Sequence, residues 1–314
     1  MSEVTPVIYL LAGVTAAGKS ELSLKWAEQM GGEILSCDSI AIYRGMDIGS
    51  AKPSADDRNR VCHHGIDLVN ADTIFSVLDY SLYAKGVVDG AVEKSTPVLV
   101  SGGSGFYLQS FLSPVVDEIQ VGMDVREQVE QLNEERGLDG LLQVLKEHNP
   151  RGLGNLDILN PRRVIRALER CLASGKPILE LKQEFERQEA PYADFEKMLI
   201  WLDRENEEIE ARIAKRTQQM LDDGLLGEAE KLLSLGIERN PSASNSVGYR
   251  ECIACLKGEI PEQELLPLIN HSTRRLVSKQ RKWFRKHFGS EARILMSDAL
   301  KLNEPAEWNW VRHS

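Results

Sequence analysis

The chain has 314 residues, 42% of them apolar and 27% charged, which is the balance of a soluble globular protein with a proper core. Its length suits one large domain or two moderate ones. No apolar run approaches the roughly 18 residues of a membrane span, and the N-terminus lacks the basic start of a signal peptide. Five scattered cysteines, an odd number, favour a reducing compartment. We therefore expect a cytoplasmic protein without a membrane partner.

The net charge of −10 argues against a nucleic-acid partner only as an average, because patches rather than totals bind polyanions. The stretch RRLVSKQRKWFRK at 274–286 contains seven basic residues and no acid. A second, arginine-rich stretch, NPRRVIRALER, occupies 160–170. Either stretch alone is typical of a solvated helix face, but two acid-poor clusters on so acidic a chain favour polyanion binding. Trp283 and Phe284 in the first stretch either stack on bases or form the buried side of their helix.

Short apolar strands alternate with helices in the first third of the chain. The pattern predicts strand 6–12, helix 19–29, strand 33–37, helix 76–94 and strand 97–100. The long helix begins with a capping-box sequence, Ser76-x-x-Asp79. This alternation predicts an α/β fold whose parallel sheet is covered by helices on both faces.

Between 118 and 190 the strand pattern stops, and a charged sequence of helical period with glycine breaks predicts a helical insertion domain. Within it, Asn160 is a good N-cap, Pro161 suits the first helical position and Gly175 ends the helix. After the insertion, we expect a strand at 198–202 and helices at 206–223, 226–235, 247–257 and 262–287. The core domain is therefore expected to consist of 1–117 and 191–314, and EPAEWNW at 304–310 has no clear assignment.

A phosphate-binding motif follows the first strand. Residues 13–20, GVTAAGKS, match G-x-x-x-x-G-K-[ST] at every fixed position, between a buried strand and a helix. The glycines let successive backbone N–H groups face one anion, and the helix N-terminus adds partial positive charge. Lys19 supplies a charge for the outer phosphates and Ser20 a hydroxyl for Mg²⁺. A simple glycine-rich turn does not explain the Lys19-Ser20 pair.

The position of the nearest carboxylate bears on which reaction the phosphate site serves. P-loop hydrolases hold Mg²⁺ with a carboxylate at the end of a second strand. Strand 97–100 ends instead in SGGSG at 101–105, whereas strand 33–37 ends at Asp38, which the usual sheet order places next to the P-loop. A diphosphate cradle, one carboxylate and one hydroxyl loop suit a reaction in which diphosphate leaves and Asp38 accepts a proton. A kinase that uses Asp38 as its base fits the same residues.

With these motifs in place, the chain resembles the bacterial tRNA dimethylallyltransferases, also called tRNA isopentenyltransferases or the IPP transferase family. The matching segments occur in the family's order and span nearly the whole chain: GVTAAGKS at 13–20, DSIAIYRGMDIGSAKP at 38–53, HHGIDLV at 63–69, GGSGFYL at 102–108, NPRRVIRALE at 160–169, RIAKRTQQMLDDGLLGEAE at 212–230, VGYRE at 247–251 and KQRKWFRK at 279–286. The P-loop alone is generic, but its combination with the motif at 38–53 is highly specific.

The resemblance implies transfer of a dimethylallyl group from dimethylallyl diphosphate to N6 of the adenosine immediately 3′ of the anticodon in tRNA, with release of diphosphate. It implies a P-loop NTPase-like parallel sheet flanked by helices, a helical insertion that contacts the anticodon stem-loop, and Mg²⁺ as cofactor. Nothing in it demands more than a monomer. By position, Asp38 matches the family's general base, and Ser104 stands where the family usually has a threonine near the reacting centre.

The resemblance also assigns the binding residues. Those that bind diphosphate are the P-loop and one arginine, with Ser20 also holding the metal: Gly13, Val14, Thr15, Ala16, Ala17, Gly18, Lys19, Ser20 and Arg216. Arg212 lies in the same cationic segment as Arg216. The segments that contact tRNA supply Asp38, Ser39, Ile40, Ala41, Ser104, Arg126, Arg162, Arg163, Val164, Ile165, Arg166, Asn245, Val247, Gly248, Tyr249, Arg250, Lys279, Arg281, Lys282 and Arg285.

Besides Ser104, three positions depart from the family pattern. Val14 replaces the usual proline, Ala17 the usual serine and Ala41 the usual glutamine. The P-loop keeps its glycines, so we expect diphosphate binding to survive the first two changes. Loss of the glutamine amide at position 41 affects a local tRNA contact rather than the chemistry.

Two short motifs contain residues that can bind metal. Cys252-x-x-Cys255 lacks a second pair of ligands, so we expect these cysteines to pack within a helix. His63-His64 matches the family motif and, with no further ligands nearby, is expected to order its loop.

Two other activities fit parts of the sequence. A prenyltransferase that acts on free AMP, ADP or ATP, like the related plant-hormone enzymes, needs neither the insertion nor the basic C-terminal helix. An RNA-binding P-loop protein without transfer activity has no use for an intact set of Asp38, Lys19 and Ser104.

Overall fold

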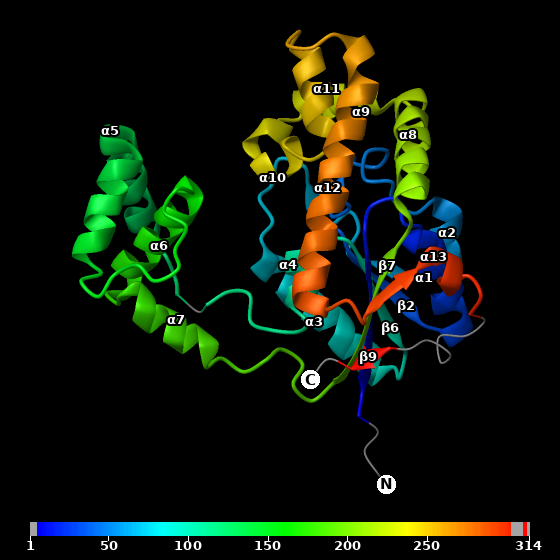
Figure 1. Ribbon diagram of the computed structural model, residues 1–314, viewed down its shortest axis with the longest axis horizontal. Helices are drawn as coiled ribbons and strands as arrows, with labels where there is room; N and C mark the ends of the chain where they lie inside the picture. The colour runs from blue at the N-terminus through cyan, green and yellow to red at the C-terminus, as the bar shows by residue number, and fades with distance from the viewer. Residues whose placement is uncertain (1–4, 118, 303–309, 313–314) are drawn as a thin grey trace. The chain divides into compact units, whose positions relative to one another are not determined.

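The computed structural model of the protein describes residues 5–117, 119–302 and 310–312 (Figure 1). The chain forms a core unit, Met1–Ser113 with Pro191–Ser314, and an insertion unit, Pro114–Ala190, slightly longer than the expected 118–190. In the described part of the chain, no helix is both long and apolar enough to cross a bilayer. The unassigned segment at 304–310 lies outside the described residues except for its last position.

A parallel sheet forms the centre of the core unit. Its strand order is β4-β2-β6-β1-β7-β8, and β9 pairs antiparallel with β7. The strands are β1 (Val7–Gly13), β2 (Glu33–Cys37), β4 (His63–His64), β6 (Val98–Gly102), β7 (Glu196–Asp203), β8 (Arg293–Leu295) and β9 (Val311–Arg312). The predicted α/β class is confirmed, and the four predicted strands are present, one with the predicted ends and three with ends shifted by one or two residues. The missed strands are too short to show a period of their own.

The central strands are apolar because helices cover the sheet (Figure 1). Leu10 in β1, Val100 in β6 and Trp201 in β7 are fully buried. Gly102 ends β6 against β2, where a Cβ atom would lie 2.0 Å from the carbonyl oxygen of Cys37. This close approach brings the carboxyl ends of β2 and β6 together.

The predicted helices of the first third are present. The helix α1 (Lys19–Met30) follows the P-loop directly, and α3 (Val77–Glu93) begins at the predicted capping box. Ser76 Oγ accepts the Asp79 N–H at 3.2 Å, and Asp79 Oδ2 accepts the Ser76 N–H at 2.8 Å. Shorter elements complete this region, namely β3 (Tyr43–Arg44), α2 (Ala55–Arg60), β5 (Val69–Asn70) and α4 (Gly105–Gln109).

The C-terminal part of the core unit is mainly helical. Its helices are α8 (Asn206–Asp222), α9 (Leu225–Ser234), η1 (Ile237–Arg239), α10 (Pro241–Ser244), α11 (Tyr249–Leu256), η2 (Glu262–Glu264), α12 (Leu265–Phe288) and α13 (Met296–Ala299). The long α12 packs against α8 and α11 (Figure 1). Two predicted starts were wrong, because Gly248 takes a positive φ of 93° before α11 and a separate 3₁₀ turn precedes α12.

The insertion unit consists of α5 (Met123–Glu147), α6 (Pro161–Ser174) and α7 (Ile178–Glu186), with a separate apolar core. Gly137 interrupts α5 with φ 60° and ψ −162°. The predicted ends of α6 are confirmed. The Asn160 side chain accepts the Arg163 N–H, Pro161 occupies the first turn, and Gly175 closes the helix in the left-handed conformation.

Candidate functional site

A cavity of about 740 Å³ lies at the carboxyl ends of the central strands, where parallel α/β sheets bind their ligands. Thr15, Lys19 and Ser20 line it from the P-loop. Asp38, after β2, and Ser104, after β6, line the same space. The structure therefore brings together the residues that the sequence assigned to diphosphate binding and to catalysis.

Asp38 is not placed as the usual sheet order suggested. Because β6 lies between β1 and β2, the hydroxyl loop at 103–105, and not Asp38, is the neighbour of the P-loop in the sheet. The sequence carries no signal for which of two buried strands pairs with β1. Both groups still face one cavity, because the carboxyl ends of the three parallel strands meet at one edge of the sheet.

The shape of the P-loop is fixed by arginines from outside it. Ala16 and Gly18 take left-handed backbone conformations, with φ of 65° and 102°. Arg212 Nε donates to the carbonyl oxygen of Ala16, and Arg204 Nε donates to that of Ala17, each at 2.8 Å. Arg212, which the sequence placed near diphosphate, therefore acts on the loop that cradles it.

Two partly buried cations mark the place of an anion in the cavity. Lys19 Nζ donates to the carbonyl oxygen of Val14 at 2.9 Å. Burial lowers the pKa of Lys19 to about 8; Asp38 raises it in part, and Arg216 lowers it again. Burial also lowers the pKa of Arg216. Cations that have lost their hydration gain most from a negatively charged ligand, which is what the P-loop motif predicts.

Asp38 and Ser104 are oriented by neighbouring loop residues. Asp38 Oδ1 accepts the N–H of Ile40 at 2.8 Å and that of Ala41 at 3.4 Å. Ser104 Oγ accepts the Ser39 N–H at 2.9 Å and donates to Ser39 Oγ at 3.1 Å. Asp38 Oδ2 has no hydrogen-bond partner among the described residues, so one carboxylate oxygen holds the loop and the other is available to take a proton.

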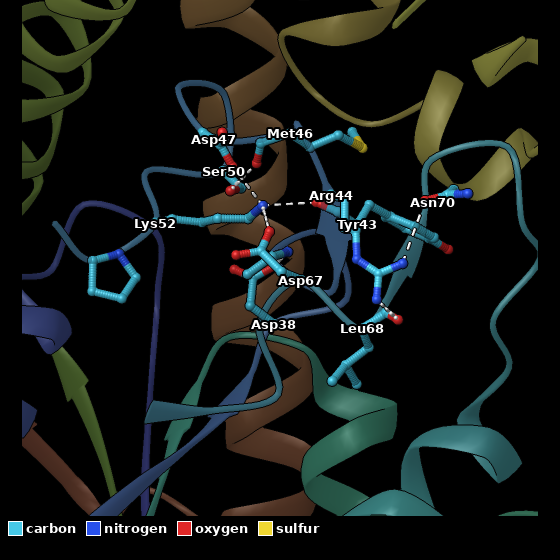
Figure 2. Close-up of polar contacts among 12 residues, drawn as sticks. Asp38, Tyr43, Arg44, Met46, Asp47, Ser50, Lys52, Asp67, Leu68 and Asn70 are labelled. Carbon is cyan, nitrogen blue, oxygen red and sulfur yellow. Dashed lines mark hydrogen bonds and ion pairs between the residues drawn. The ribbon is translucent and has the colours of Figure 1, made fainter. Parts of the chain in front are cut away.

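The motif at 38–53 orders the loop beyond Asp38 (Figure 2). The Lys52 side chain is 2% exposed, and its Nζ donates to the carbonyl oxygen of Tyr43 at 2.7 Å. It also forms ion pairs with Asp47 and Asp67, each at 2.6 Å. Burial alone would raise the pKa of Asp67, but its bonds to cations hold that pKa below the ordinary value. The motif that makes the resemblance specific thus includes a lysine that stabilises the loop.

Tyr249 supports the same loop from α11. Its hydroxyl donates to Glu228 Oε1 at 2.6 Å, and the Glu228 carboxylate accepts the N–H groups of Asp47 and Ile48, each at 2.9 Å. Gly49 passes so close to the Tyr249 ring that a Cβ atom would lie 2.4 Å from it. Tyr249 is fully buried, so its side chain positions this loop and does not reach RNA as the resemblance implied.

Other residues near Tyr249 remain accessible. Asn245, Val247 and Gly248 line the cavity, and the Arg250 side chain is half exposed. Asn245, Val247 and Arg250 keep exposed surface that a nucleic acid can reach, whereas Gly248 is buried.

Gln280 of α12 joins the P-loop to the hydroxyl loop. Its Oε1 accepts the Thr15 N–H at 2.8 Å, and its Nε2 donates to the carbonyl oxygen of Gly103 at 3.1 Å. A Cβ atom at Gly103 would lie 2.5 Å from Gln280 Nε2, so a larger residue there would make the Gln280 amide shift. Sequence analysis missed Gln280, although it is the one uncharged polar residue in KQRKWFRK. A neutral amide among cations was the available signal.

Arg281, by contrast, is held in an ion pair near the C-terminal end of α12. Its NH2 lies 2.8 Å from Oδ1 of Asp203, which is fully buried at the end of β7. The same guanidinium donates to the carbonyl oxygen of Arg204 at 2.7 Å, and Arg293 pairs with the other oxygen of Asp203. Only 17% of the Arg281 side chain is exposed. The tRNA contact expected for Arg281 is therefore replaced by a structural role, which charge pattern alone does not reveal.

The remaining side chains of this segment divide between core and surface. Both aromatic side chains line the cavity, but Phe284 is fully buried and so belongs to the buried side of the helix, whereas Trp283 is partly exposed. Lys279, Lys282 and Arg285 are exposed. These three cations are therefore accessible to a polyanion, as the prediction requires.

The insertion unit has a cavity of its own, of about 590 Å³. Its lining, all within the described residues, includes no carboxylate and five cations, Arg162, Arg163, Arg166, Arg170 and Lys182. Arg126 is exposed on α5. Val164 is fully buried in the core of this unit and Ile165 packs partly against that core, so neither fits the tRNA contact that the resemblance implied.

Comparison with known proteins identifies the family. Residues 41–287 match the family described as IPP transferase. The chain belongs to this family. It is 45% identical over 289 residues to the tRNA dimethylallyltransferase of Opitutus terrae, covering 92% of this chain and 93% of that one. It is 37% identical to tRNA dimethylallyltransferase 2 of Geotalea daltonii, covering 89% and 85%.

Solved structures of IPP transferases have the same fold. The tRNA isopentenylpyrophosphate transferase of Bacillus halodurans superposes with a TM-score of 0.68 at 28% identity, covering 96% of this chain and 95% of that one. A eukaryotic dimethylallyltransferase, described as acting on tRNA, gives a TM-score of 0.80 at 20% identity, covering 97% and 81%. At that identity the second likeness is evidence of the fold alone.

The two sequence motifs that contain potential metal ligands have different surroundings in the structure. Cys252 is fully buried in α11, and burial raises the pKa of its thiol to about 12, so it packs as expected. The expectation that His64 lacks further ligands nearby was wrong. Strand pairing brings Glu33, 31 residues away in the sequence, beside His64, and the Cys62 thiol, two residues before it, also lies next to the imidazole. The pairing of β2 with β4 was not visible to sequence patterns.

Proposed function

We propose that this chain transfers a dimethylallyl group from dimethylallyl diphosphate to N6 of the adenosine 3′-adjacent to the anticodon in tRNA, releasing diphosphate. The observation that carries the proposal is the shared cavity, where the P-loop, Asp38 and Ser104 meet beneath the exposed cations of α12. The names of the bacterial relatives support the same activity.

The P-loop side of the cavity stabilises the leaving group. An allylic diphosphate ionises readily when the charge that develops on its leaving oxygens is stabilised. Lys19 and Arg216 supply that charge, since both are desolvated cations that face the cavity. The Ser20 hydroxyl is exposed and lines the cavity, where it would hold Mg²⁺ beside the diphosphate. When bound, Mg²⁺ would neutralise part of the diphosphate charge.

Asp38 acts on the acceptor. The exocyclic amine of adenine is a weak nucleophile, because its lone pair is delocalised into the ring. As the N6–C1 bond forms and the C1–O bond to diphosphate breaks, one proton leaves N6 and Asp38 Oδ2 accepts it. A well-placed general base contributes about 10²–10⁴-fold. Ser104 holds the loop of Asp38 through Ser39 and lines the space between base and diphosphate.

The exposed cations bind the tRNA. The target base must leave its stack, which a single-stranded anticodon loop permits at low cost. Lys279 lines the cavity of the core unit, Lys282 and Arg285 are exposed on the same helix, and the arginines of α6 offer a second surface to the RNA phosphates. As the sequence led us to expect, we propose that the protein acts as a cytoplasmic monomer.

The test is incubation with labelled dimethylallyl diphosphate, Mg²⁺ and tRNA that lacks the modification, followed by mass analysis of the nucleosides. We expect label in tRNA as N6-dimethylallyladenosine. Absence of label with folded protein contradicts the proposal. Faster turnover on free AMP or ATP than on tRNA would support the nucleotide prenyltransferase instead, and RNA binding without label would support a binding protein.

A further inference from the structure

Three side chains that can ligate a metal ion lie together outside the catalytic cavity. Glu33, Cys62 and His64 bring a carboxylate oxygen, a thiol sulfur and an imidazole nitrogen within 4.8 Å of one another. Glu33 begins β2, and His64 lies in β4, which pairs in parallel with β2 at the edge of the sheet. None of the three lines the cavity of the core unit. The proposed transfer reaction therefore leaves this cluster without a role.

We propose that Glu33, Cys62 and His64 form a binding site for a divalent metal ion of the zinc class. Thiolate, imidazole and carboxylate are the three side-chain ligands that Zn²⁺ takes in proteins. Their mixture of soft sulfur with nitrogen and oxygen disfavours Mg²⁺ and Ca²⁺, which select oxygen ligands. Three protein ligands leave the fourth tetrahedral position for water.

Two of the three distances between the ligand atoms are close to those around such an ion, and the third, from Cys62 Sγ to the Glu33 carboxylate, is at most 4.8 Å. Cys62 Sγ lies 3.5 Å from His64 Nε2. Sulfur and nitrogen on one tetrahedral Zn²⁺ are separated by about 3.6 Å. His64 Nε2 lies 2.7 Å from Glu33 Oε2, a hydrogen-bond distance. The ion requires about 3.3 Å between these atoms, so the Glu33 carboxylate must withdraw by about 0.6 Å.

The surroundings permit that movement. The backbone of Glu33 is fixed by its N–H, which donates to the carbonyl oxygen of Pro97 at 2.9 Å, so only the side chain has to move. Cys62 is exposed, and the Glu33 and His64 side chains are 19% and 26% exposed, which gives an ion access from solvent. A bound ion would replace the Glu33–His64 bond and tie the two-residue edge strand β4 to β2. Its role would be structural, distant from the reacting groups.

Cobalt is the most direct probe of the site. We expect the metal-free chain to bind one equivalent of Co²⁺ with a thiolate-to-cobalt charge-transfer band, and Zn²⁺ to displace the cobalt. Zn²⁺ should also raise the melting temperature, because it binds the folded chain through residues that only folding brings together. A wild-type chain that takes up less than one equivalent of either ion at micromolar concentrations overturns the proposal.

Substitutions locate the ion. Cys62→Ser should abolish the charge-transfer band and weaken Zn²⁺ binding at least tenfold, and Glu33→Gln should weaken binding while keeping the band. Cys255→Ser is the matched control, since Cys255 is a partly exposed thiol on α11, and should change neither readout. Both Cys62→Ser and Cys255→Ser should retain transfer activity. Unchanged binding in Cys62→Ser, or loss in Cys255→Ser, would place the ion elsewhere and overturn the assignment.

Discussion

The cavities of the two units hold different kinds of side chain. The cavity of the core unit combines one carboxylate at its centre, Asp38, with hydroxyls, the P-loop and a few cations that are partly committed to hydrogen bonds. The cavity of the insertion unit contains five cations and, across its described lining, no carboxylate, although four of the cations form ion pairs with carboxylates outside the lining. The first has the groups that a reaction needs, whereas the second has only the charge that a polyanion needs. Chemistry and electrostatic attraction are therefore assigned to separate units of the chain.

The difference also explains how a chain with a net charge of −10 can bind tRNA. Acidic residues dominate the total, but they are absent from the lining of the insertion cavity and from the segment at 274–286. An acidic exterior with a few basic surfaces repels a polyanion in most orientations and attracts it in few. The net charge thus restricts where RNA binds without preventing binding.

Asp38→Asn should have the largest effect, and it should be confined to the chemistry of the core cavity. Asparagine keeps an oxygen that can accept the Ile40 N–H, so the loop should stay in place, but it cannot accept the proton. We expect the single-turnover transfer rate to fall by about 10²–10⁴-fold, with tRNA affinity changed by no more than a few-fold. Single-turnover kinetics and filter binding separate the two quantities.

Asp72→Asn is a suitable control for Asp38→Asn. Asp72 lies in the core unit outside the cavity lining and pairs with Arg239 near the surface. Its substitution should leave the transfer rate unchanged. Loss of tRNA binding in Asp38→Asn, with a normal rate at saturating tRNA, would show that Asp38 contacts RNA and is not the base.

The next largest effect is on stability, and it should differ between two arginines of α12. Arg281→Ala leaves the buried Asp203 carboxylate with Arg293 as its remaining side-chain partner, so we expect the free energy of unfolding to fall by about 3 kcal/mol. Arg285→Ala removes an exposed cation and should change it by less than about 0.5 kcal/mol while weakening tRNA binding. Urea unfolding of both variants measures the two free energies of unfolding. Equal stabilities would mean that the Asp203 pair contributes little.

These two arginines also show how far sequence reasoning reaches. The P-loop, Asp38 and Ser104 were predictable because each is a local motif at the end of a buried strand, and parallel strands place such ends together. Arg281 and Arg285 are four residues apart in one basic segment, and only the tertiary position of Asp203 separates their roles. The roles of Gln280 and Glu228 depend likewise on contacts between distant segments. Pattern reasoning therefore located the chemistry but could not tell structural cations from free ones.

The pH dependence of diphosphate binding tests the desolvated cation of the core cavity. Because the pKa of Lys19 is lowered to about 8, the side chain is charged below that pH and loses its proton above it. The affinity for inorganic diphosphate should therefore fall as pH rises through 8, approaching tenfold per pH unit. Lys19→Arg stays charged across this range and should remove the step, whatever its absolute affinity. Calorimetric titration from pH 7 to about 9.5 measures both profiles; a step that persists in Lys19→Arg would belong to another group.

The smallest effect should come from the insertion cavity and should involve no chemistry. Arg162→Gln with Arg166→Gln removes two of its five cations, so we expect tRNA binding to weaken and its salt dependence to become shallower, by about 0.9 in the log–log slope for each phosphate that the variant no longer neutralises. The transfer rate at saturating tRNA should not change. Arg151→Gln, an exposed cation of the same unit outside the cavity lining, is the matched control and should keep the original slope. A lower rate at saturation in the double variant would mean that the insertion unit also orients the reacting base, and the separation of chemistry from charge would fail.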